Sequence, residues 1–390
     1  MTDVVVVDAV RTPFGRRGGA YASAHSIHVL GDLLKGLLER NPSVHATDIG
    51  QVVAGCVGQA GMQASNIGRG AWLAAGLPVN VPAVTVDSQC GSSQQAANVV
   101  FALIAAGVID SAIACGVELM SQVPMGATVP KDGSLGKPIT RRYWEHHEFT
   151  TQFEGAERIA EQWGISRDDC DRFAKQSQDR AAVAVREGRF DSQLVSIDLP
   201  EPGENNKATL RITKDEALRE TTLEGLAKLK PTGRPDGVHT AGSSSQIADG
   251  ASALLMMSAD RARELRLAPL AQVVDSCLVG SDPVLMLTGP IPATKTLLTR
   301  NGLTIADIDV VEINEAFASV VLAWQQELGA DLSNVNPNGG AIALGHPLGG
   351  TGTALITKAV HELHRNGGTY GLVTMCCGGG LGTGTLLRKL

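Results

Sequence analysis

Apolar and polar residues alternate in blocks along the first 120 residues, and these blocks predict strands and helices in turn. The β-branched run VVVV near the N-terminus is typical of a buried strand. Longer segments with apolar residues at the helical period lie between such runs. Strands are expected at 4–7, 51–57, 81–88 and 110–118, and helices at 26–40 and 91–107. This order favours an α/β fold with mainly parallel strand pairing.

The middle of the chain has a different pattern. Residues 120–250 are richer in charge, proline and glycine than the segments on either side. Helices are expected over 156–164 and 168–188, where apolar residues return at the helical period. We interpret this part as an excursion that covers a site on the α/β body.

The last 120 residues repeat the pattern of the first. The segment ATDIGQVVAGC resembles IADIDVVEINE, and their Asp48 and Asp307 are 259 positions apart. The segment AIACGVE resembles LVTMCCGGG, and their Cys115 and Cys376 are 261 positions apart. Two similar offsets predict an internal duplication of one α/β unit. Equivalent loops from the two halves are then expected to meet at a pseudo-twofold centre.

Composition narrows the class of protein. The chain has 390 residues, 43% of them hydrophobic, and a formal net charge of −7. The basic clusters Arg16-Arg17 and Arg141-Arg142 are short and lack interleaved aromatic residues, so a nucleic-acid protein is not expected. No apolar run reaches the roughly 18 residues that span a membrane. An odd number of cysteines, seven, and no leader pattern at the N-terminus predict reduced thiols in the cytoplasm.

Cys90 lies where a predicted strand gives way to a helix, in the segment VTVDSQCGSSQQ. Free N–H groups and the positive end of the helix dipole at such a position stabilise a thiolate. The small residues at 91–93 leave room for a substrate. An inert buried cysteine also fits this position, which by itself does not separate the two interpretations.

His346 stands in the glycine-dense segment NPNGGAIALGHPLGGTGT. Gly340 and Gly345 have the spacing of a phosphate-binding loop. His346-Pro347 replaces the lysine and hydroxyl residue that such a loop requires, so a nucleotide site is rejected. Pro347 suits the first turn of a helix, which places His346 at a helix start, where a neutral imidazole is favoured and serves as a base. A structural histidine in a turn is the alternative.

Two more segments place polar or thiol groups at the end of a predicted strand. In GLVTMCCGGG, one of Cys376 and Cys377 is a candidate acid–base group and the other packs in the strand, with a disulfide between them as the alternative. The N–H of Gly378 is free to point at a ligand. In VEINEAFA, position alone favours Asn314 as a helix cap over a group that holds a water or polarises an oxygen.

Six segments, in order along essentially the whole chain, resemble the thiolase family. They are VVVVDAVRTPFGR, VDSQCGSS, HTAGSSSQIADGA, NEAFA, GGAIALGHPLGGTG and CCGGG. The resemblance implies an α/β fold of duplicated thiolase-like halves in a layered αβαβα body. It further implies a first half over 1–120 and 247–270, a loop domain over 121–246 that covers the CoA site, and a second half over 271–390.

The resemblance also implies a role for each candidate residue. Cys90 is expected to accept the acyl group, with His346 as its base and Cys376 as the acid–base group for the reacting carbon. Asn314 would hold a water that completes one oxyanion hole with His346, which reverses the preference for a cap. The N–H groups of Cys90 and Gly378 would form the second hole, around the thioester oxygen.

The implied reaction is acyl transfer between a cysteine thioester and CoA. A 3-ketoacyl-CoA would be cleaved to acetyl-CoA or propionyl-CoA and a shortened acyl-CoA, as in fatty acid β-oxidation and lipid metabolism. Ser245 is expected to contact the pantetheine arm, and Arg219 is the nearest candidate for the adenine end. CoA is expected as a substrate, with no permanently bound cofactor and no metal, because zinc-type Cys and His spacings are missing.

Departures from the family pattern bear on the substrate. A His-Met-Gly segment is not visible near 150–155, where the chain reads TTQFEGAERIA, and this disfavours a biosynthetic acetoacetyl-CoA thiolase that condenses two acetyl-CoA. Gln89 and the run QCGSSQQA resemble the branch that acts on bulky or steroid-derived chains.

Two further alternatives remain. A decarboxylating ketoacyl synthase of the same fold is disfavoured by the C-x-G-G-G cysteine, and a non-catalytic CoA- or lipid-binding relative would be expected to lose Cys90, His346 or Cys376. The resemblance implies a homodimer or a homotetramer of two dimers, acyl-CoA as the binding partner, and neither nucleic-acid binding nor membrane insertion.

Overall fold

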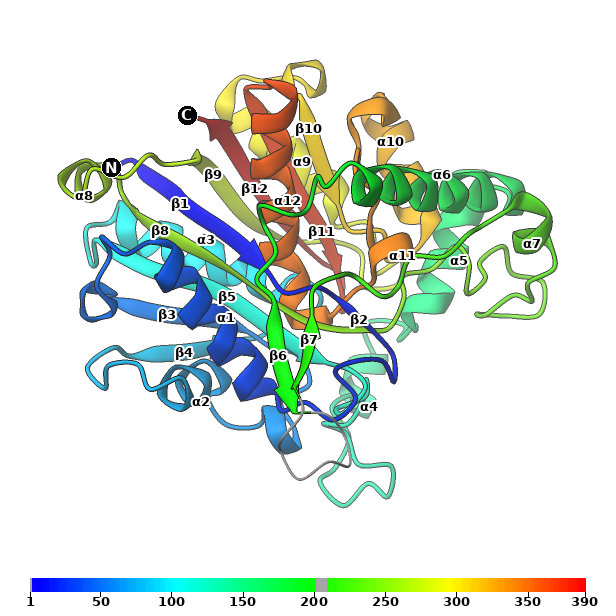
Figure 1. The fold of residues 1–390 in the computed structure, drawn as a ribbon. Coiled ribbons are helices and arrows are strands. Elements are labelled where there is room, and N and C mark those ends of the chain that lie inside the picture. The colour runs from blue at the N-terminus through cyan, green and yellow to red at the C-terminus, as the bar shows by residue number, and fades with distance from the viewer. Residues whose placement is uncertain (1, 201–208) are drawn as a thin grey trace.

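The computed structural model describes residues 2–200 and 209–390. Among these residues, ten strands form one sheet along the path β10-β11-β12-β9-β1-β8-β5-β3-β4, with β2 beside β8, and β6 and β7 form a separate pair (Figure 1). The strands are β1 (Val4–Arg11), β2 (Gly15–Arg16), β3 (Gln51–Gly55), β4 (Ala83–Val86), β5 (Ser111–Leu119), β6 (Ile197–Pro200), β7 (Thr209–Ile212), β8 (Ala248–Ser258), β9 (Ala271–Gly280), β10 (Val310–Ile313), β11 (Tyr370–Cys377) and β12 (Leu381–Lys389).

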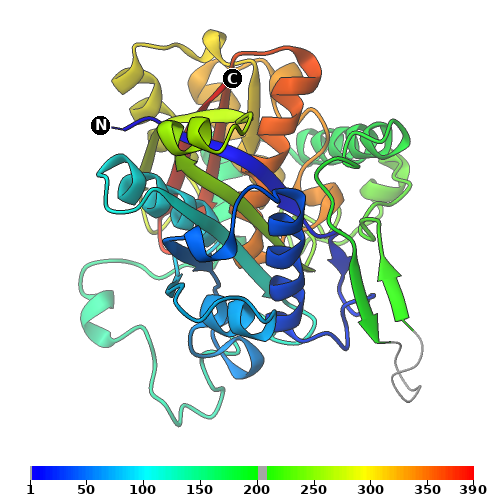
Figure 2. The same cartoon turned by 60° about the vertical axis from the view of Figure 1, so that its left-hand side comes forward.

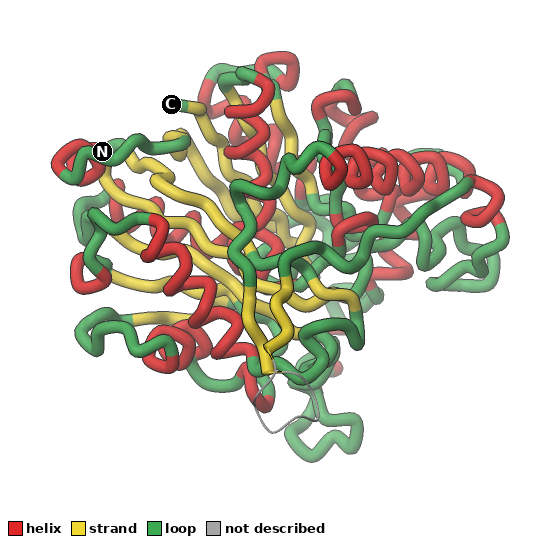
Figure 3. Tube along the Cα trace, in the orientation of Figure 1, coloured by secondary structure: helices red, strands yellow, loops and turns green. Residues whose placement is uncertain are grey.

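Helices cover the sheet and make up part of the inserted segment, which also contains long loops, as the tube of Figure 3 shows. They are α1 (Ser26–Arg40), α2 (Ile67–Ala74), α3 (Ser92–Ala105), α4 (Arg141–Trp144), α5 (Gln152–Gln162), α6 (Arg167–Arg186), α7 (Leu223–Ala227), α8 (Ala259–Glu264), α9 (Pro290–Asn301), α10 (Ala318–Leu328), α11 (Ala341–Leu344) and α12 (Thr351–Asn366). The α/β elements predicted in the first 120 residues are confirmed, and α1 occupies the predicted range 26–40.

The strand pairing differs from the prediction. Only the pairs β3–β4, β3–β5 and β10–β11 are parallel among the described strands. The other pairs of the large sheet are antiparallel, so the expectation of mainly parallel pairing is wrong. A parallel neighbour needs a crossover connection, usually a helix. The chain instead reverses directly from β11 into β12, and β8 re-enters beside β1 after the long insertion.

The predicted duplication is confirmed by the pairing pattern. In the first half β1 is antiparallel to β8, β8 to β5, and β5 is parallel to β3. In the second half β9, β12, β11 and β10 follow the same order with the same directions. The two halves of the sheet join through β1 and β9, where Val4 lies opposite Val273. Helices α3 and α12 start 259 positions apart, which matches the offset seen in the sequence.

The elements form the predicted layers. Helices α3 and α12 pack against each other in the middle, in an apolar cluster that includes Val100, Ile356 and Val373. Helices α1 and α2 cover the outer face of the first half, and α9 and α10 cover the second half (Figure 1). The middle helices approach closely because Gly352 has no side chain: a Cβ there would lie 2.2 Å from the backbone nitrogen of Gln94.

Helices α5 and α6, in the segment between β5 and β8, pack against the second half. Ile159 of α5 and Phe173 of α6 share an apolar cluster with Val320 and Trp324 of α10. The part before α5 extends away from the body in Figure 2, and nearly all of residues 124–149 are exposed. We propose the division of the chain drawn from its sequence: halves over 1–120 with 247–270 and over 271–390, and a loop domain over 121–246.

Candidate active site

Cys90 lies in a tight turn between the edge strand β4 and helix α3, directly before the N-cap of that helix. Gln89 has a positive φ of 52°, a conformation that is costly for a residue other than glycine and persists where its surroundings hold it. The Asp87 carboxylate accepts the N–H of Gln89 at 2.7 Å, and the Ser92 hydroxyl donates to the Gln89 carbonyl at 2.6 Å. These bonds fix the turn that presents the thiol.

Burial raises the pKa of the Cys90 thiol to about 11, whereas hydrogen bonds from the N–H groups of Cys90 and Gly378 lower it. The N–H groups therefore lower the pKa of Cys90, as predicted, but burial raises it by more. At neutral pH the resting protein holds a thiol that needs a base. The same two N–H groups are those assigned to the second oxyanion hole, a role that remains a prediction.

His346 lies between α11 and a 3-10 turn at Leu348–Gly350, and α12 begins only at Thr351. Pro347 precedes the 3-10 turn and is not in the first turn of an α-helix, so that expectation is wrong. Burial lowers the pKa of His346 to about 4, which makes the imidazole neutral at neutral pH. The predicted neutral state agrees with the structure, but its cause is burial and not the end of a helix.

Thr351 determines which ring nitrogen of His346 carries the hydrogen. Its hydroxyl lies 2.6 Å from Nδ1 and donates to the Pro347 carbonyl at 2.8 Å. Because a hydroxyl has one hydrogen, it accepts the hydrogen bond from Nδ1–H. The amide Nδ2 of Asn314, which is a hydrogen-bond donor, lies 3.4 Å from Nε2. These partners assign the hydrogen to Nδ1 and leave a lone pair on Nε2.

Asn314 is buried at the end of β10 and does not cap the helix that follows. Helix α10 begins at Ala318 with Phe317 as its N-cap, so the interpretation of Asn314 as a cap is wrong. Its Oδ1 is buried without a hydrogen-bond partner among the described residues. Leaving such an acceptor unpaired costs about 1–3 kcal/mol, and a native protein retains it mainly where a water or ligand binds.

Cys376 and Cys377 are consecutive on β11, so their side chains point to opposite faces of the sheet. Burial and the charge of Cys90 both raise the pKa of each thiol, that of Cys377 to about 12. A Cβ on Gly91 would lie 2.6 Å from the Cys377 sulfur, so Cys377 packs beneath the turn that carries Cys90. All seven cysteines are free, which excludes the disulfide alternative in this structure. Cys376 therefore stays the predicted acid–base group.

A cavity of about 410 Å³ opens beside Cys90. Four of the predicted residues line it: Cys90, His346, Ser245 and Arg219. Asn314, Cys376 and Gly378 do not line the cavity and instead surround His346 and Cys90. The rest of the lining is largely apolar and includes Met120, Met125, Phe153, Leu287, Phe317 and Leu348. The structure thus brings together residues from both halves and from the insertion.

Glu315 is a site residue that the sequence interpretation missed. Its buried carboxylate accepts hydrogen bonds from Ser177 Oγ at 2.6 Å, Asn336 Nδ2 at 2.9 Å and the N–H of Ile342 at 3.1 Å. These bonds anchor the glycine-dense segment that leads to His346. The available signal was the presence of two acidic residues and one asparagine in the short, otherwise apolar segment VEINEAFA.

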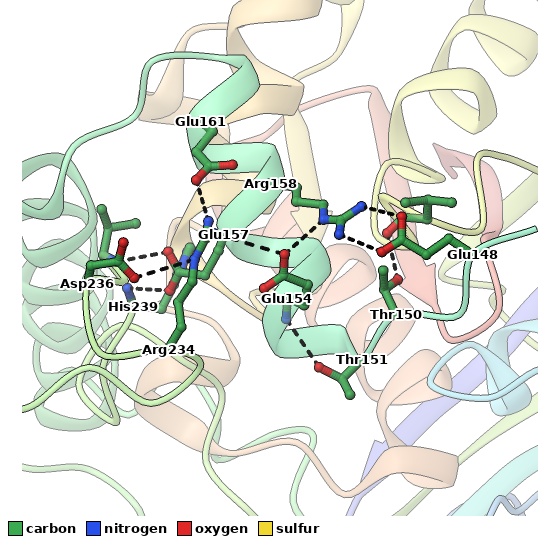
Figure 4. A network of polar contacts seen from close by, with 12 residues as sticks. Glu148, Thr150, Thr151, Glu154, Glu157, Arg158, Glu161, Arg234, Asp236 and His239 are labelled. Atoms are coloured by element: carbon green, nitrogen blue, oxygen red, sulfur yellow. Dashed lines mark hydrogen bonds and ion pairs between the residues drawn. The ribbon is translucent and has the colours of Figure 1, made fainter.

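A second buried carboxylate holds the cavity wall on the insertion (Figure 4). Glu157 accepts the N–H groups of Val238 at 2.8 Å and His239 at 3.1 Å, and lies 3.1 Å from Nδ1 of His239. The His239 ring packs edge-on against Phe317, with 5.3 Å between centroids. The segment continues to Ser245, whose N–H donates to the Ala316 carbonyl at 2.9 Å.

No helix within residues 2–200 and 209–390 is long and apolar enough to cross a membrane. The part of the chain that the structure describes contains no group of three or more His, Cys, Asp and Glu side chains arranged to hold a metal ion.

Comparison with known proteins identifies the family of this chain. The family description "Thiolase, N-terminal domain" matches residues 4–260, and "Thiolase, C-terminal domain" matches residues 267–389. The steroid 3-ketoacyl-CoA thiolase FadA6 of Mycobacterium tuberculosis is 45% identical over 396 residues, which is 100% of this chain and 95% of that protein. A beta-ketoadipyl-CoA thiolase of Acinetobacter baylyi is 40% identical over 406 residues, and each chain is covered completely.

A solved structure gives the same result for the fold. The acetyl-CoA acetyltransferase of Bacillus anthracis superposes with a TM-score of 0.91 at 35% sequence identity, over 100% of this chain and 99% of the other. The predicted fold and the predicted class of enzyme are confirmed. The chain belongs to the thiolase family, whose members are acyltransferases that act on CoA thioesters.

Proposed function

We propose that this thiolase cleaves a bulky 3-ketoacyl-CoA with free CoA, with Cys90 as the acyl acceptor. One observation carries the proposal: the Cys90 thiol and the neutral His346 imidazole line one cavity, and the imidazole has an unprotonated Nε2. A thiol with a raised pKa and a neutral base are the pair that nucleophilic catalysis needs before substrate binds.

The proposed first half-reaction moves one acyl group onto the protein. Nε2 of His346 takes the proton of Cys90, and the thiolate attacks the 3-keto carbon. The bond between C2 and C3 then breaks, and the leaving enolate of acetyl-CoA or propionyl-CoA takes a proton from Cys376. Donors aimed at each developing oxyanion contribute about 10²–10³ in rate apiece, which is the role proposed for the Asn314 water and for the N–H groups of Cys90 and Gly378.

In the second half-reaction the Cys376 thiolate takes the thiol proton of free CoA, and the CoA thiolate attacks the acyl-Cys90 thioester. The Cys90 thiolate leaves and takes its proton back from His346, while the shortened acyl group departs on CoA. CoA is thus a substrate, and no permanently bound cofactor takes part in the proposed steps. Ser245 and Arg219 are proposed to hold the pantetheine arm and the adenine end, because both line the cavity and Ser245 bonds to Ala316 in its wall.

The nature of the acyl chain is proposed from the cavity and from relatives. Met120, Phe153 and Phe317 give the cavity an apolar wall suited to a large chain. The relative from Mycobacterium tuberculosis is named for steroid 3-ketoacyl-CoA, and it is 45% identical to this chain. We therefore propose bulky or steroid-derived 3-ketoacyl chains over the condensation of two acetyl-CoA.

A thiolysis panel tests the proposal. Wild-type protein is given short, long and steroid-side-chain 3-ketoacyl-CoA with free CoA, and acetyl-CoA alone for the condensation. The bulky chains are expected to give the highest kcat/KM, and intact-mass measurement without CoA is expected to show an acyl adduct. Cys90→Ala should lose the adduct, whereas Cys277→Ala, a change to a half-buried thiol outside the site, should keep it. Full thiolysis by Cys90→Ala would end the proposal.

We further propose a homodimer, alone or paired into a tetramer. Strand β4 is an edge of the sheet, with Val84 38% exposed and the nearby Val79 77% exposed. The extended part of the insertion exposes Leu135 and Trp144 as well. Bare edges and exposed apolar groups support association. Light scattering should show dimers or tetramers for wild-type protein and smaller species for Val84→Lys. The same oligomer mass for the variant as for wild-type protein would place the interface elsewhere.

The cytoplasm is the proposed compartment. Seven cysteines, none of them in a disulfide in this structure, support a reducing environment. Fractionation of cells that express the tagged full chain is expected to recover it with the cytosolic fraction.

A further inference from the structure

A buried carboxylate at the end of β5 joins the two halves of the chain near His346. Glu118 is 1% exposed and accepts the N–H of Gly349, in the second half, at 3.0 Å. It also accepts the N–H groups of Val57 at 2.9 Å and Gly58 at 3.0 Å, in the first half. In the part of the chain that the structure describes, no lysine or arginine pairs with this group. Burial raises the pKa of the Glu118 carboxyl, and the N–H groups oppose this shift by stabilising the charged form.

The residue that Glu118 bonds belongs to the turn that carries the catalytic histidine. Gly349 lies in the 3-10 turn between His346 and α12. The turn closes on the Pro347 carbonyl, which also accepts the Thr351 hydroxyl at 2.8 Å. That hydroxyl lies 2.6 Å from Nδ1 of His346 and holds its hydrogen. The turn, the hydroxyl and the imidazole thus form one hydrogen-bonded unit, so the position of Gly349 bears on that of the imidazole.

The same turn packs tightly against the first half. A Cβ on Gly116 would lie 2.1 Å from the Gly349 carbonyl oxygen, and a Cβ on Gly349 would lie 2.7 Å from Cα of Cys56. The Ser252 hydroxyl of β8 donates to the Gly350 carbonyl at 2.5 Å. These contacts keep the turn beside β5 without the carboxylate. Loss of the carboxylate is therefore expected to shift the turn locally and not to separate the halves.

A second buried carboxylate holds the other side of the same segment. Glu315, in the second half, accepts the N–H of Ile342, four positions before His346. The bond from Glu118 lies three positions after the histidine. His346 is thus held between carboxylates from both halves, whereas Cys90 stands in the first half alone. The distance between the thiol and Nε2 therefore depends on bonds that cross between the halves.

We propose that Glu118 is a positioning residue for His346, which keeps Nε2 within reach of the Cys90 thiol by bonding the turn at Gly349. Glu118 does not line the cavity, so it acts through the histidine and not on the substrate. A reacting group displaced by about 1 Å costs on the order of 10² in rate. Loss of the bond should therefore slow proton transfer from Cys90 and leave substrate binding in place. This inference rests on the proposed role of His346 as the base.

The test is single-turnover acylation of Cys90, without free CoA, by the best substrate of the thiolysis panel, followed by intact mass. Glu118→Gln keeps the shape but turns an amide NH₂ toward N–H donors. We expect its acylation rate at saturating substrate to fall about tenfold or more at pH 7, with the half-saturating concentration changed less than about threefold. Asp249→Asn is the matched control. That buried carboxylate bonds Ser121, through its N–H at 2.8 Å and its hydroxyl at 2.5 Å, instead of the segment of His346, so the rate should change less than about threefold.

The pH dependence separates a misplaced base from a loss of folded protein. Wild-type acylation is expected to be nearly constant from pH 6 to pH 9, because the pKa of His346 is about 4 and that of Cys90 about 11. With the base displaced, the reaction depends on free thiolate, so the rate of Glu118→Gln should rise up to about tenfold per pH unit. A smaller folded fraction would lower the rate by one factor at every pH, and that result would overturn the inference.

A double-variant cycle tests whether Glu118 acts through His346. His346→Ala is expected to lose more activity than Glu118→Gln, and the combined variant should lose no more than His346→Ala alone. Losses that multiply would overturn this inference and leave the proposed reaction standing. Acylation of His346→Ala at the wild-type rate would overturn the proposed reaction, and the inference with it. Glu118→Asp, which keeps the charge but withdraws it by one methylene, takes the place of Glu118→Gln in the cycle if that variant does not fold.

Discussion

At the scale of single residues, the protonation states of Cys90 and His346 define the resting site. Burial raises the pKa of the thiol to about 11 and lowers the pKa of the imidazole to about 4. Both groups are therefore neutral between these values, and a thiolate–imidazolium pair is not the resting state. In the proposed mechanism the thiolate forms as substrate binds and the proton moves to Nε2.

The pH dependence of alkylation follows from these shifts. Reaction of iodoacetamide with Cys90 is expected to rise steadily from pH 6 to pH 9, because the thiolate fraction grows throughout that range when the pKa is about 11. Rates at Cys90 are read by peptide mass spectrometry, with Cys90→Ala giving the background from other thiols. A rate that is already constant at pH 6–7 would indicate a preformed ion pair and contradict this assignment.

Thr351 is expected to matter for catalysis through the tautomer of His346. Thr351→Val removes the acceptor of Nδ1–H, so the ring loses the partner that keeps Nε2 unprotonated and oriented. We expect kcat to fall by roughly tenfold or more, a part of the 10²–10⁴ that a general base supplies. Thr351→Ser should retain most activity. Thr357→Val, which removes another buried hydroxyl of α12 bonded to the carbonyl four residues earlier, is the matched control.

Cys90, His346, Asn314 and Cys376 became candidates because each stands in a distinctive segment at the end of a strand or beside clustered glycines, and their predicted roles came from the resemblance to thiolases. The sequence did not identify Thr351 or Glu157, since their roles depend on which side chain the fold brings to which nitrogen or loop. The helix starts after His346 and Asn314 were also misplaced, because a 3-10 turn in one case and an extended N-cap at Phe317 in the other follow from tertiary contacts.

At the scale of secondary-structure elements, buried strands and helix α1 were predictable because their apolar periods are short and regular. The direction of strand pairing was not predictable from the sequence, since it depends on where long connections re-enter the sheet. Strand β8 shows this: its eleven residues are all buried, yet nothing within them says that the chain returns antiparallel to both β1 and β5.

The contact between α5 and the segment 238–245 yields an element-scale prediction. Glu157→Ala leaves the N–H groups of Val238 and His239 and the His239 ring without their acceptor, so the segment that ends at Ser245 should shift. We expect KM for CoA to rise about tenfold, with a smaller change in the rate of Cys90 acylation by a saturating substrate. Glu157→Gln, which keeps one oxygen acceptor, should recover part of the loss.

Helix α5 also offers the control for that experiment. Glu161 is one turn further along the helix and is exposed, and it pairs with Arg234 and not with the cavity wall (Figure 4). Glu161→Gln should leave KM for CoA unchanged. Equal effects of the changes at Glu157 and Glu161 on KM would show that the helix, and not the buried contact, sets the position of the wall.

At the scale of the whole molecule, the site exists because two equivalent halves meet at α3 and α12. Cys90 directly precedes the cap of α3, and His346 lies a few residues before α12. The duplication was readable from offsets near 259 in the sequence, so the meeting of loops from both halves was predictable. The close approach of α3 and α12 was not predictable, because it depends on a backbone contact at one glycine.

Gly352 is expected to control that closeness. A Cβ at this position would lie 2.2 Å from the Gln94 nitrogen, and backbone cannot move aside as a flexible side chain can. Gly352→Ala should therefore cost about 1–3 kcal/mol of stability by overpacking and should lower kcat as the starts of α3 and α12 separate. Gly70→Ala in α2, where a Cβ would meet only one side-chain atom at 3.3 Å, should stay within about 1 kcal/mol of wild type. Thermal midpoints at one protein concentration measure the loss of stability, and kcat at 15 °C measures the effect on activity. A Gly352→Ala protein with unchanged kcat would show that the active site tolerates a wider separation of the halves.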